Sequence, residues 1–382
     1  MRETQPRAWL RVGFLLFAAG WGANHFTSLL LVYRARLNLD AAAPGLLFAM
    51  YALGLAPGLL LAGPLSDRHG RRALVLPGAC VALGASALLG ASGTWFGALL
   101  LGRFLYGFGA GSVMSAGAVW LMEISASSAP GTGARRATIA LSSGFGLGPF
   151  VTGALAQFAP APTKLPFALH VLVLAGALLG VRRVRETSRG TGKRSSPLLR
   201  VQLMSGNWPR FLRRIAPMAP FVFGFPALAF AALPNVLGTG ALGPLPFVYT
   251  GLLCGLTLAA GVIAQPLTLR FTPQTSARIG LVTGAVGVAL GALVVATHAS
   301  WALLVVGPVL GVAYGVCMTA GLQASQRLAS PEGRGGVTGL YYVLTYVGFA
   351  APYLLALAMR AVTPELALEV TAAVALVIAL FV

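Results

Sequence analysis

Apolar runs of about 20 residues recur along the whole chain, separated by short stretches that contain Arg, Pro or Gly. A run of this length spans the hydrocarbon core of a bilayer as a helix, because backbone that faces lipid must bond within its own helix. Charged residues make up 9% of the 382 residues, whereas a soluble domain carries roughly 25%. The composition therefore excludes a soluble globular protein and predicts an all-α integral membrane protein.

The apolar runs predict twelve transmembrane helices. Their expected bounds are 11–33, 42–64, 73–93, 96–122, 137–159, 165–182, 211–237, 244–269, 277–297, 300–325, 336–358 and 364–382. The first run is too long for a signal-peptide core, so we expect it to be retained. Six runs lie on each side of a polar stretch rich in Arg, Ser, Gly and Thr. We predict two six-helix bundles, residues 1–182 and 210–382, joined by a cytoplasmic linker over 183–209.

Basic residues fall almost entirely on one side of this predicted topology. With the N-terminus inside, 22 of the 27 Lys and Arg residues lie in inner segments and 4 in outer ones, and Arg103 lies within a span. This bias is the positive-inside rule, and it predicts a multi-pass plasma-membrane protein with a cytoplasmic N-terminus. The net charge of +19 therefore reflects topology, and no nucleic-acid partner is expected. The excess of Arg over Lys, with abundant Ala and Gly, suggests a bacterial source.

Two short sequences recur at nearly the same offset in the two halves. Residues 63–68 (GPLSDR) match residues 265–270 (QPLTLR) at an offset of 202, and residues 114–117 (MSAG) match 318–321 (MTAG) at an offset of 204. Duplicated halves of a transporter place a substrate site near the membrane midplane between them. The halves are not chemically equivalent, because Leu269 stands where the first copy has Asp67.

Three segments resemble motifs of the major facilitator superfamily. The segment from Gly63 to Arg72 (GPLSDRHGRR) resembles the signature loop between its helices 2 and 3, and 103–111 (RFLYGFGAG) resembles its fourth-helix motif. Residues 144–153 (GFGLGPFVTG) resemble the fifth-helix motif of the drug:proton antiporters, with Thr152 where a Gly is usual. The resemblance implies a secondary transporter that works by alternating access, most similar to the drug:proton antiporter type.

Charged residues at the cytoplasmic helix ends are candidates for a gate. Ion pairs there can break and re-form between conformations, although the arginines would also serve simply to hold the loops inside. Glu123 is expected to pair with Arg135 or Arg136, and Glu332 with Arg334, in salt bridges between the bundles. The gating candidates are Gly63, Asp67, Arg68, Gly70, Arg71, Arg72, Glu123, Arg135, Arg136, Glu332 and Arg334.

Small residues in the fifth predicted span form a second candidate element. Gly144, Gly148 and Gly153 remove side chains from one helix face and Pro149 removes a backbone hydrogen bond. We predict a tight seal and pivot between the bundles at this helix-packing motif. The alternative is ordinary packing in a chain rich in Ala and Gly.

Few polar residues lie within the spans, and these are the candidates for a cavity or for proton coupling: Asn24, His25, Arg103 and Glu369. Arg103 would lie roughly 10 Å deep at 1.5 Å per residue, facing a cavity or extending to the outer headgroups. The first span lacks an acid, but His25 titrates near neutrality and can carry a proton. The alternatives are a structural buried histidine and, for Glu369, solvation at the membrane interface.

Aromatic residues suit a hydrophobic or amphipathic ligand, and the substrate-binding candidates are Trp21, Phe26, Tyr106, Trp120, Tyr314 and Tyr341. We predict a transporter that exports such a small molecule by alternating access, with protons as the coupling ion. An uptake permease for a small metabolite, by uniport or symport, and a transporter-like membrane sensor without flux remain open. No phosphate-binding Gly-Lys-Ser/Thr loop, catalytic constellation or His/Cys cluster is visible. No enzyme activity, cofactor or metal is therefore expected, and we expect a monomer in the lipid bilayer.

Overall fold

The computed structural model describes residues 7–93, 95–129, 131–188, 202–204, 206–330 and 333–382. Over these residues the regular structure is helical, apart from an isolated bridge between Leu203 and Ala329. In this part of the chain 11 helices are long and apolar enough to cross a membrane, and Leu165–Val181 adds a shorter apolar helix. The prediction of an all-α membrane fold is confirmed.

The chain divides into two compact units. Unit 1 comprises Met1–Phe26, Met50–Val151 and Ala159–Leu198, and unit 2 comprises Thr27–Ala49, Thr152–Phe158 and Leu199–Val382. Two short segments of the first half of the sequence thus belong to the same compact unit as the whole second half.

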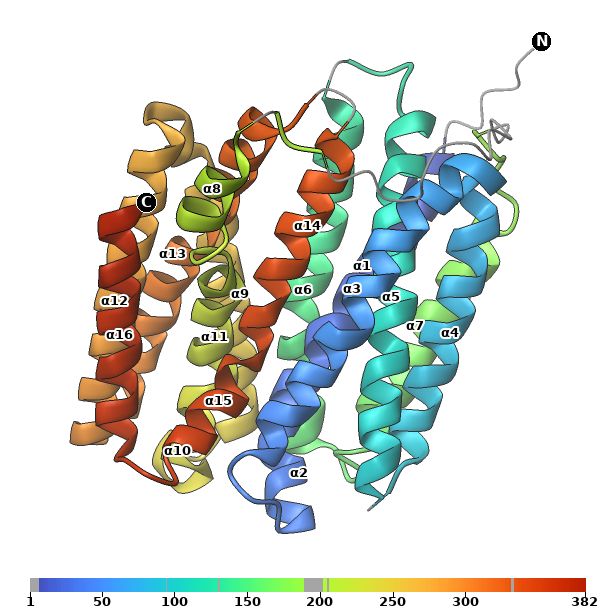
Figure 1. The fold of residues 1–382 in the computed structure, drawn as a ribbon. Helices are drawn as coiled ribbons and strands as arrows, with labels where there is room; N and C mark the ends of the chain where they lie inside the picture. Colours follow the sequence, from blue (N-terminus) through green and yellow to red (C-terminus); the bar gives the residue numbers. More distant parts are fainter. Residues whose placement is uncertain (1–6, 94, 130, 189–201, 205, 331–332) are drawn as a thin grey trace. The chain divides into compact units, whose positions relative to one another are not determined.

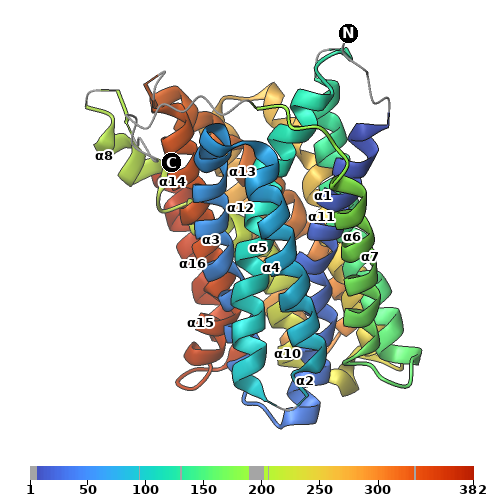
Figure 2. The same ribbon diagram turned by 90° about the vertical axis from the view of Figure 1, so that its right-hand side faces the viewer.

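Unit 1 contains α1, α4, α5 and α7, together with most of α3 and α6. In both Figure 1 and Figure 2, α4 and α5 lie side by side. The helices are α1 (Ala8–Asn24), α3 (Ala43–His69), α4 (Arg71–Ala91), α5 (Phe96–Ile124), α6 (Thr132–Phe158) and α7 (Leu165–Val181).

Unit 2 contains the remaining helices, among which α12 packs against both α13 and α16 (Figure 1). Its helices are α2 (Leu30–Leu37), α8 (Trp208–Arg210), α9 (Ala219–Ala227), α10 (Leu233–Leu237), α11 (Pro246–Ala264), α12 (Pro273–Thr297), α13 (Leu303–Leu328), α14 (Arg334–Tyr346), α15 (Ala351–Ala358) and α16 (Pro364–Phe381).

Helices α3 and α5 pack backbone against backbone along a line of glycines, which we call the first glycine seam. A Cβ at Gly107 would lie 2.1 Å from the carbonyl oxygen of Tyr51, and one at Gly111 would lie 2.6 Å from that of Leu55. On the facing helix, a Cβ at Gly54 would lie 1.9 Å from the carbonyl oxygen of Phe104. No side chain fits at these positions, and small residues allow membrane helices to approach this closely.

Unit 2 contains a second glycine seam, between α11 and α13. A Cβ at Gly311 would lie 1.9 Å from the carbonyl oxygen of Thr257, and one at Gly315 would lie 1.9 Å from that of Gly261. Gly311 and Gly315 follow Gly107 and Gly111 by 204 positions, the offset that relates the MSAG and MTAG sequences. The same packing device therefore recurs in both halves, which supports a duplicated origin.

Several predicted spans are interrupted rather than continuous. A 3-10 turn over His25–Leu29 separates α1 from α2, and π-helical turns occur at Phe211–Ile215 and Leu228–Ala232. The second π-helical turn comes just before Pro234, which has no backbone N–H to donate to the preceding turn. Such irregular turns free backbone carbonyls inside the fold and are frequent at functional sites.

Candidate functional site

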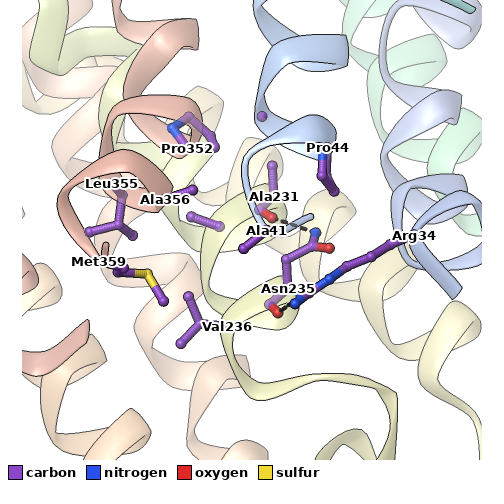
Figure 3. Close-up of a pocket in the computed structure, with 12 residues that line it drawn as sticks. Arg34, Ala41, Pro44, Ala231, Asn235, Val236, Pro352, Leu355, Ala356 and Met359 are labelled. Carbon is purple, nitrogen blue, oxygen red and sulfur yellow. Dashed lines mark hydrogen bonds between the residues drawn. The ribbon is translucent and has the colours of Figure 1, made fainter. Parts of the chain in front are cut away.

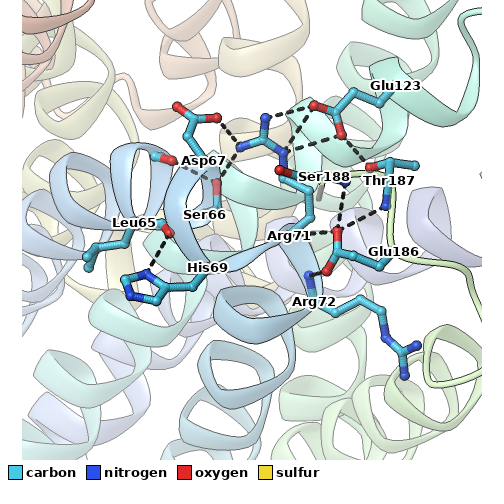
Figure 4. Close-up of polar contacts among 11 residues, drawn as sticks. Leu65, Ser66, Asp67, His69, Arg71, Arg72, Glu123, Glu186, Thr187 and Ser188 are labelled. Atoms are coloured by element: carbon cyan, nitrogen blue, oxygen red, sulfur yellow. Dashed lines mark hydrogen bonds and ion pairs between the residues drawn. The ribbon is translucent and has the colours of Figure 1, made fainter. Parts of the chain in front are cut away.

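Charged side chains from the ends of three helices meet around Arg71 in unit 1 (Figure 4). The Arg71 side chain is only 7% exposed, with Nη1 2.5 Å from Asp67 Oδ1 and Nη2 2.7 Å from Glu123 Oε1. Nη1 also donates to the hydroxyl of Ser66 at 2.6 Å. A buried guanidinium is stable only while a compensating charge stays beside it, and Arg71 has two carboxylates that provide this charge.

The start of α4 is capped by an acid from beyond α7. Oxygens of Glu186 accept the backbone N–H of Arg71 at 2.9 Å and that of Arg72 at 2.8 Å. A carboxylate at a helix N-terminus satisfies unpaired N–H groups and complements the helix dipole. Gly70 directly precedes α4, and its φ of +100° is a backbone conformation that residues with a side chain rarely adopt. Gly70 is thus required by the turn of the signature loop.

The residues that follow α7 are fixed to α4 and α5 by further hydrogen bonds. The Thr187 hydroxyl donates to Glu123, and Arg72 Nη2 donates to the carbonyl oxygen of Arg182 at 2.8 Å. The indole N–H of Trp120 donates to the carbonyl oxygen of Arg185 at 3.0 Å. Trp120, a predicted substrate contact, therefore lies beside this charged network.

Glu186 is the functional residue that the sequence analysis missed. It is the only acid between residues 183 and 209, and it lies four residues after a predicted span, among several arginines. A lone acid in an otherwise basic segment is a signal for a specific partner, and the partner here is the N-terminus of α4.

The other predicted gate residues have different surroundings. Glu123 pairs with Arg71 rather than with Arg135 or Arg136. Arg136 donates to the Ser125 hydroxyl at 3.1 Å and its guanidinium lies 4.0 Å above the ring of Trp9. The remaining gate candidates are the exposed Arg135 and Arg334, the half-buried Gly63 and Arg68, and Glu332, which lies outside the described residues.

A cation lies between two aromatic rings in the interior of unit 1. Arg103 is 0% exposed, and its guanidinium carbon is 4.7 Å from the ring centre of Phe26 and 4.6 Å from that of Tyr51. This stacking is a cation–π arrangement, which gains strength where water is excluded. The side chain is fully buried among these rings rather than extended to a surface. That Arg103 faces a cavity stays a prediction.

Two histidines lie next to this cation. The ring centres of His25 and His170 are 4.9 Å apart, and both side chains are fully buried. In His170, Nε2 is 3.0 Å from the carbonyl oxygen of Ala18 and Nδ1 is 2.9 Å from the Ser86 hydroxyl oxygen. Because a carbonyl only accepts, we assign the hydrogen of His170 to Nε2 and the Ser86 hydroxyl as the donor to Nδ1.

His25 is bonded differently from His170. Neither of its ring nitrogens has a hydrogen-bond partner among the described residues. The Tyr106 ring lies 6.5 Å away, and its hydroxyl donates to the carbonyl oxygen of Ala19 at 3.0 Å. Asn24, the neighbouring predicted cavity residue, is buried as well. Buried nitrogens without partners call for a specific explanation, such as a proton carrier or a bound ligand.

Glu369, the remaining predicted coupling residue, is exposed on α16 next to the exposed Leu366 and Val370. It does not point into the core of unit 2, so the arrangement fits the interfacial alternative better than a buried proton site.

The glycines of the small-residue motif in α6 lie close to neighbouring backbone. A Cβ at Gly144 would lie 2.7 Å from the backbone nitrogen of Trp21, and one at Gly148 would lie 2.6 Å from its carbonyl oxygen. Within unit 2, a Cβ at Gly153 would lie 2.3 Å from the carbonyl oxygen of Phe247. Pro149 lies inside the same helix. These contacts establish close helix packing, and a pivot remains a prediction.

Four aromatic rings of unit 2 gather around Phe223, and of these only Phe349 is buried while the others are half-buried. The Phe223 ring lies 4.9 Å from Tyr346, 4.8 Å from Phe349 and 5.4 Å from Tyr314, measured between ring centres. The Tyr341 hydroxyl donates to the carbonyl oxygen of Cys317 at 3.1 Å. Of the two predicted substrate contacts in this unit, Tyr314 belongs to the aromatic group and Tyr341 is engaged with the backbone.

The sequence profile described as Major Facilitator Superfamily matches residues 12–381, and the chain belongs to this superfamily of membrane transporters. Among curated proteins, the multidrug resistance protein MdtL of Escherichia coli is 40% identical over 79 residues, which cover 20% of this chain and 19% of MdtL. The match thus spans about a fifth of that relative.

Solved structures of transporters share the fold. The nucleoside transporter NupG, in a variant form, has a TM-score of 0.77 at 14% identity, covering 98% of each chain. A peptide transporter named POT has a TM-score of 0.79 at 14% identity, covering 98% of this chain and 93% of the other. At this identity the likeness concerns the fold alone.

Proposed function

We propose that this transporter exports a hydrophobic or amphipathic small molecule in exchange for protons, by alternating access between residues 1–182 and 210–382. The observation that carries the proposal is the buried pair His25 and His170 beside Arg103. His25 lies in the first predicted span, which has no acid, and provides that span with a side chain that can take up a proton.

The proton site would be His25. Its ring nitrogens are without hydrogen-bond partners among the described residues, whereas both ring nitrogens of His170 lie within bonding distance of Ala18 or Ser86. His25 can therefore gain or lose a proton without breaking an existing bond. An imidazole ring exists in a neutral and a protonated form, so it can carry a proton. The other titratable or charged groups of this region are Arg103 and Tyr106 on α5 and Tyr51 on α3.

The aromatic rings around Phe223 support an apolar substrate. The rings of Phe223, Tyr346 and Phe349 are stacked, and their faces can pack against a flat, apolar molecule. They provide few hydrogen bonds of the kind that a sugar needs. The short match to MdtL, whose name describes multidrug resistance, agrees with this choice of substrate class.

The second candidate is an uptake permease for a small metabolite, by uniport or symport. The observation that favours it is Arg103, because a buried guanidinium can also bind an anionic group of a substrate. This reading needs no proton on His25.

Transport by the purified protein in proteoliposomes separates the two candidates. Vesicles loaded with a fluorescent amphipathic dye are tested with and without a pH gradient, and dye counterflow is measured at equal pH. Antiport predicts that the gradient drives the dye against its concentration and that a protonophore abolishes this movement. If the gradient has no effect while a metabolite exchanges rapidly, the permease is correct and the export proposal is wrong.

A further inference from the structure

Unit 2 contains a pocket beside the end of α10, with an empty volume of about 400 Å³ that includes its open mouth (Figure 3). Arg34 and Asn235 line one side, and Leu355 and Met359 line the other. No role has so far been given to these residues.

The irregular backbone before α10 builds the polar side of this pocket. Helix α10 ends at Leu237, and its last carbonyls lack partners within the helix. Arg34 Nη1 donates to one of them, the backbone carbonyl of Asn235. A cation at a helix C-terminus is favourable, and the Arg34 guanidinium has further N–H groups besides the one that donates to this carbonyl.

The Asn235 side chain presents a hydrogen-bond acceptor in a fixed orientation. Its Nδ2 donates to the carbonyl oxygen of Ala231 at 2.8 Å, one helical turn earlier, which determines which end of the amide is the oxygen. The residue is 7% exposed, and its Oδ1 accepts no hydrogen bond from any described residue. Figure 3 shows Oδ1 turned away from Ala231, on the side of Arg34 and Pro44. A buried amide oxygen of this kind requires a donor.

The rest of the lining determines what else a ligand must have. Ala41, Val236, Pro352, Leu355 and Met359 provide apolar walls, and no acid lines the pocket. The nearby Asp40 forms an ion pair with Arg360 at 2.9 Å. The only charge in the lining is thus positive, which favours an anionic head group over a cationic one.

We propose that this pocket binds a small 2-hydroxycarboxylate with an apolar body. The carboxylate accepts hydrogen bonds from the Arg34 guanidinium, and the adjacent hydroxyl donates to Asn235 Oδ1. The apolar body lies against Leu355 and Met359. Arg34 needs a hydrogen-bond acceptor and Asn235 Oδ1 needs a donor. A 2-hydroxycarboxylate carries both groups on neighbouring carbon atoms.

The lining comes from two distant parts of the sequence within unit 2. Arg34 and Pro44 precede the linker, whereas Asn235 and Met359 follow it. The proposed binding does not depend on which substrate the protein carries.

Binding is tested by isothermal titration calorimetry on the full-length protein in phosphatidylcholine nanodiscs, with mandelate as the probe. Phenylacetate lacks the hydroxyl and 2-phenylethanol lacks the carboxylate. We expect each comparator to bind about tenfold more weakly than mandelate, which is roughly the loss that one missing hydrogen bond causes. In the protein, Asn235→Leu and Arg34→Met should weaken mandelate binding by a similar factor.

The matched control is Asn207→Leu, which alters an amide of the same unit that does not line the pocket. The proposal is overturned if mandelate does not bind, if phenylacetate binds equally well, or if Asn207→Leu weakens binding as much as Asn235→Leu. The ligand comparison uses the unaltered protein, so it stays decisive even if a variant fails to fold. Dye transport without mandelate tests the proposed export separately.

Discussion

Arg71 and Glu123 form a two-point ion pair, with Nη2 at 2.7 Å and Nε at 3.2 Å from the same glutamate oxygen. The pair joins the start of α4 to the end of α5, and Asp67 and Thr187 are bonded to it. The end of α3, the start of α4 and the end of α5 are thereby fixed to one another in unit 1 (Figure 4).

Glu123→Gln should destabilise unit 1, because the nearly buried Arg71 loses one of its two compensating charges. We expect a loss of about 2 kcal/mol in the free energy of unfolding, as for other hydrogen bonds to charged groups. Thermal unfolding of the purified protein measures this effect. The control is Glu369→Gln, which alters an exposed acid on α16 and should change stability little. Equal effects of the two substitutions would contradict the assignment.

Glu186→Ala should release the N-terminus of α4. The loss of an N-cap carboxylate costs about 1–2 kcal/mol. The amides of Arg71 and Arg72 should exchange faster with deuterium, while amides in the middle of α4 keep their protection. Unchanged protection of these two amides would show that Glu186 is not the cap in the membrane.

Gly107→Ala should push α5 away from α3, because the new Cβ would lie 2.1 Å from the carbonyl oxygen of Tyr51. Overpacking of this kind typically costs about 1–3 kcal/mol. Gly84→Ala in α4 is the matched control, since nothing lies within 4 Å of its Cβ position. That control should be neutral or gain up to about 1 kcal/mol from helix propensity. The yield of monodisperse protein and the midpoint of unfolding report both effects.

Arg103→Lys keeps the positive charge but loses the planar stacking on Phe26 and Tyr51. We expect dye transport to fall by about tenfold, the equivalent of 1–2 kcal/mol of buried cation–π interaction. Transport at the unaltered rate, in a variant that unfolds at the same temperature, would mean that the stacking has no functional part.

His25→Gln should separate coupling from translocation. The variant should keep dye counterflow at equal pH, which needs no net proton movement, and lose accumulation driven by a pH gradient. His170→Gln is the comparison, and it should reduce stability by breaking the bonds to Ser86 and Ala18. If His25→Gln still accumulates dye against its gradient, the proton is carried elsewhere.

The helical spans were predictable because the bilayer imposes length and apolarity on each of them. The runs expected at 96–122 and 300–325 correspond to helices over Phe96–Ile124 and Ser300–Leu328. The run expected at 244–269 contains Pro246 near its start, and Pro246 is the first residue of α11. Proline suits this position because a first-turn N–H has no partner within the helix.

The partners of polar residues were much harder to predict. The sequence predicted Arg135 or Arg136 as the partner of Glu123, because both are close to it in the chain. The actual partner, Arg71, comes from another helix. The bonds of His170 to Ser86 and to the Ala18 carbonyl depend equally on tertiary packing. Periodicity and composition indicate which residues lie in a span. They do not indicate which face of each helix turns toward which neighbour, so they cannot predict the side-chain partners.

The two glycine seams restrict how this protein can change. Gly54, Gly107 and Gly111 in one half, and Gly311 and Gly315 in the other, meet a neighbouring backbone where not even a methyl group fits. Directed evolution of the chain should therefore return glycine at these positions in every surviving clone. New specificities would have to arise among the aromatic and polar side chains, while the two lines of closest contact stay invariant.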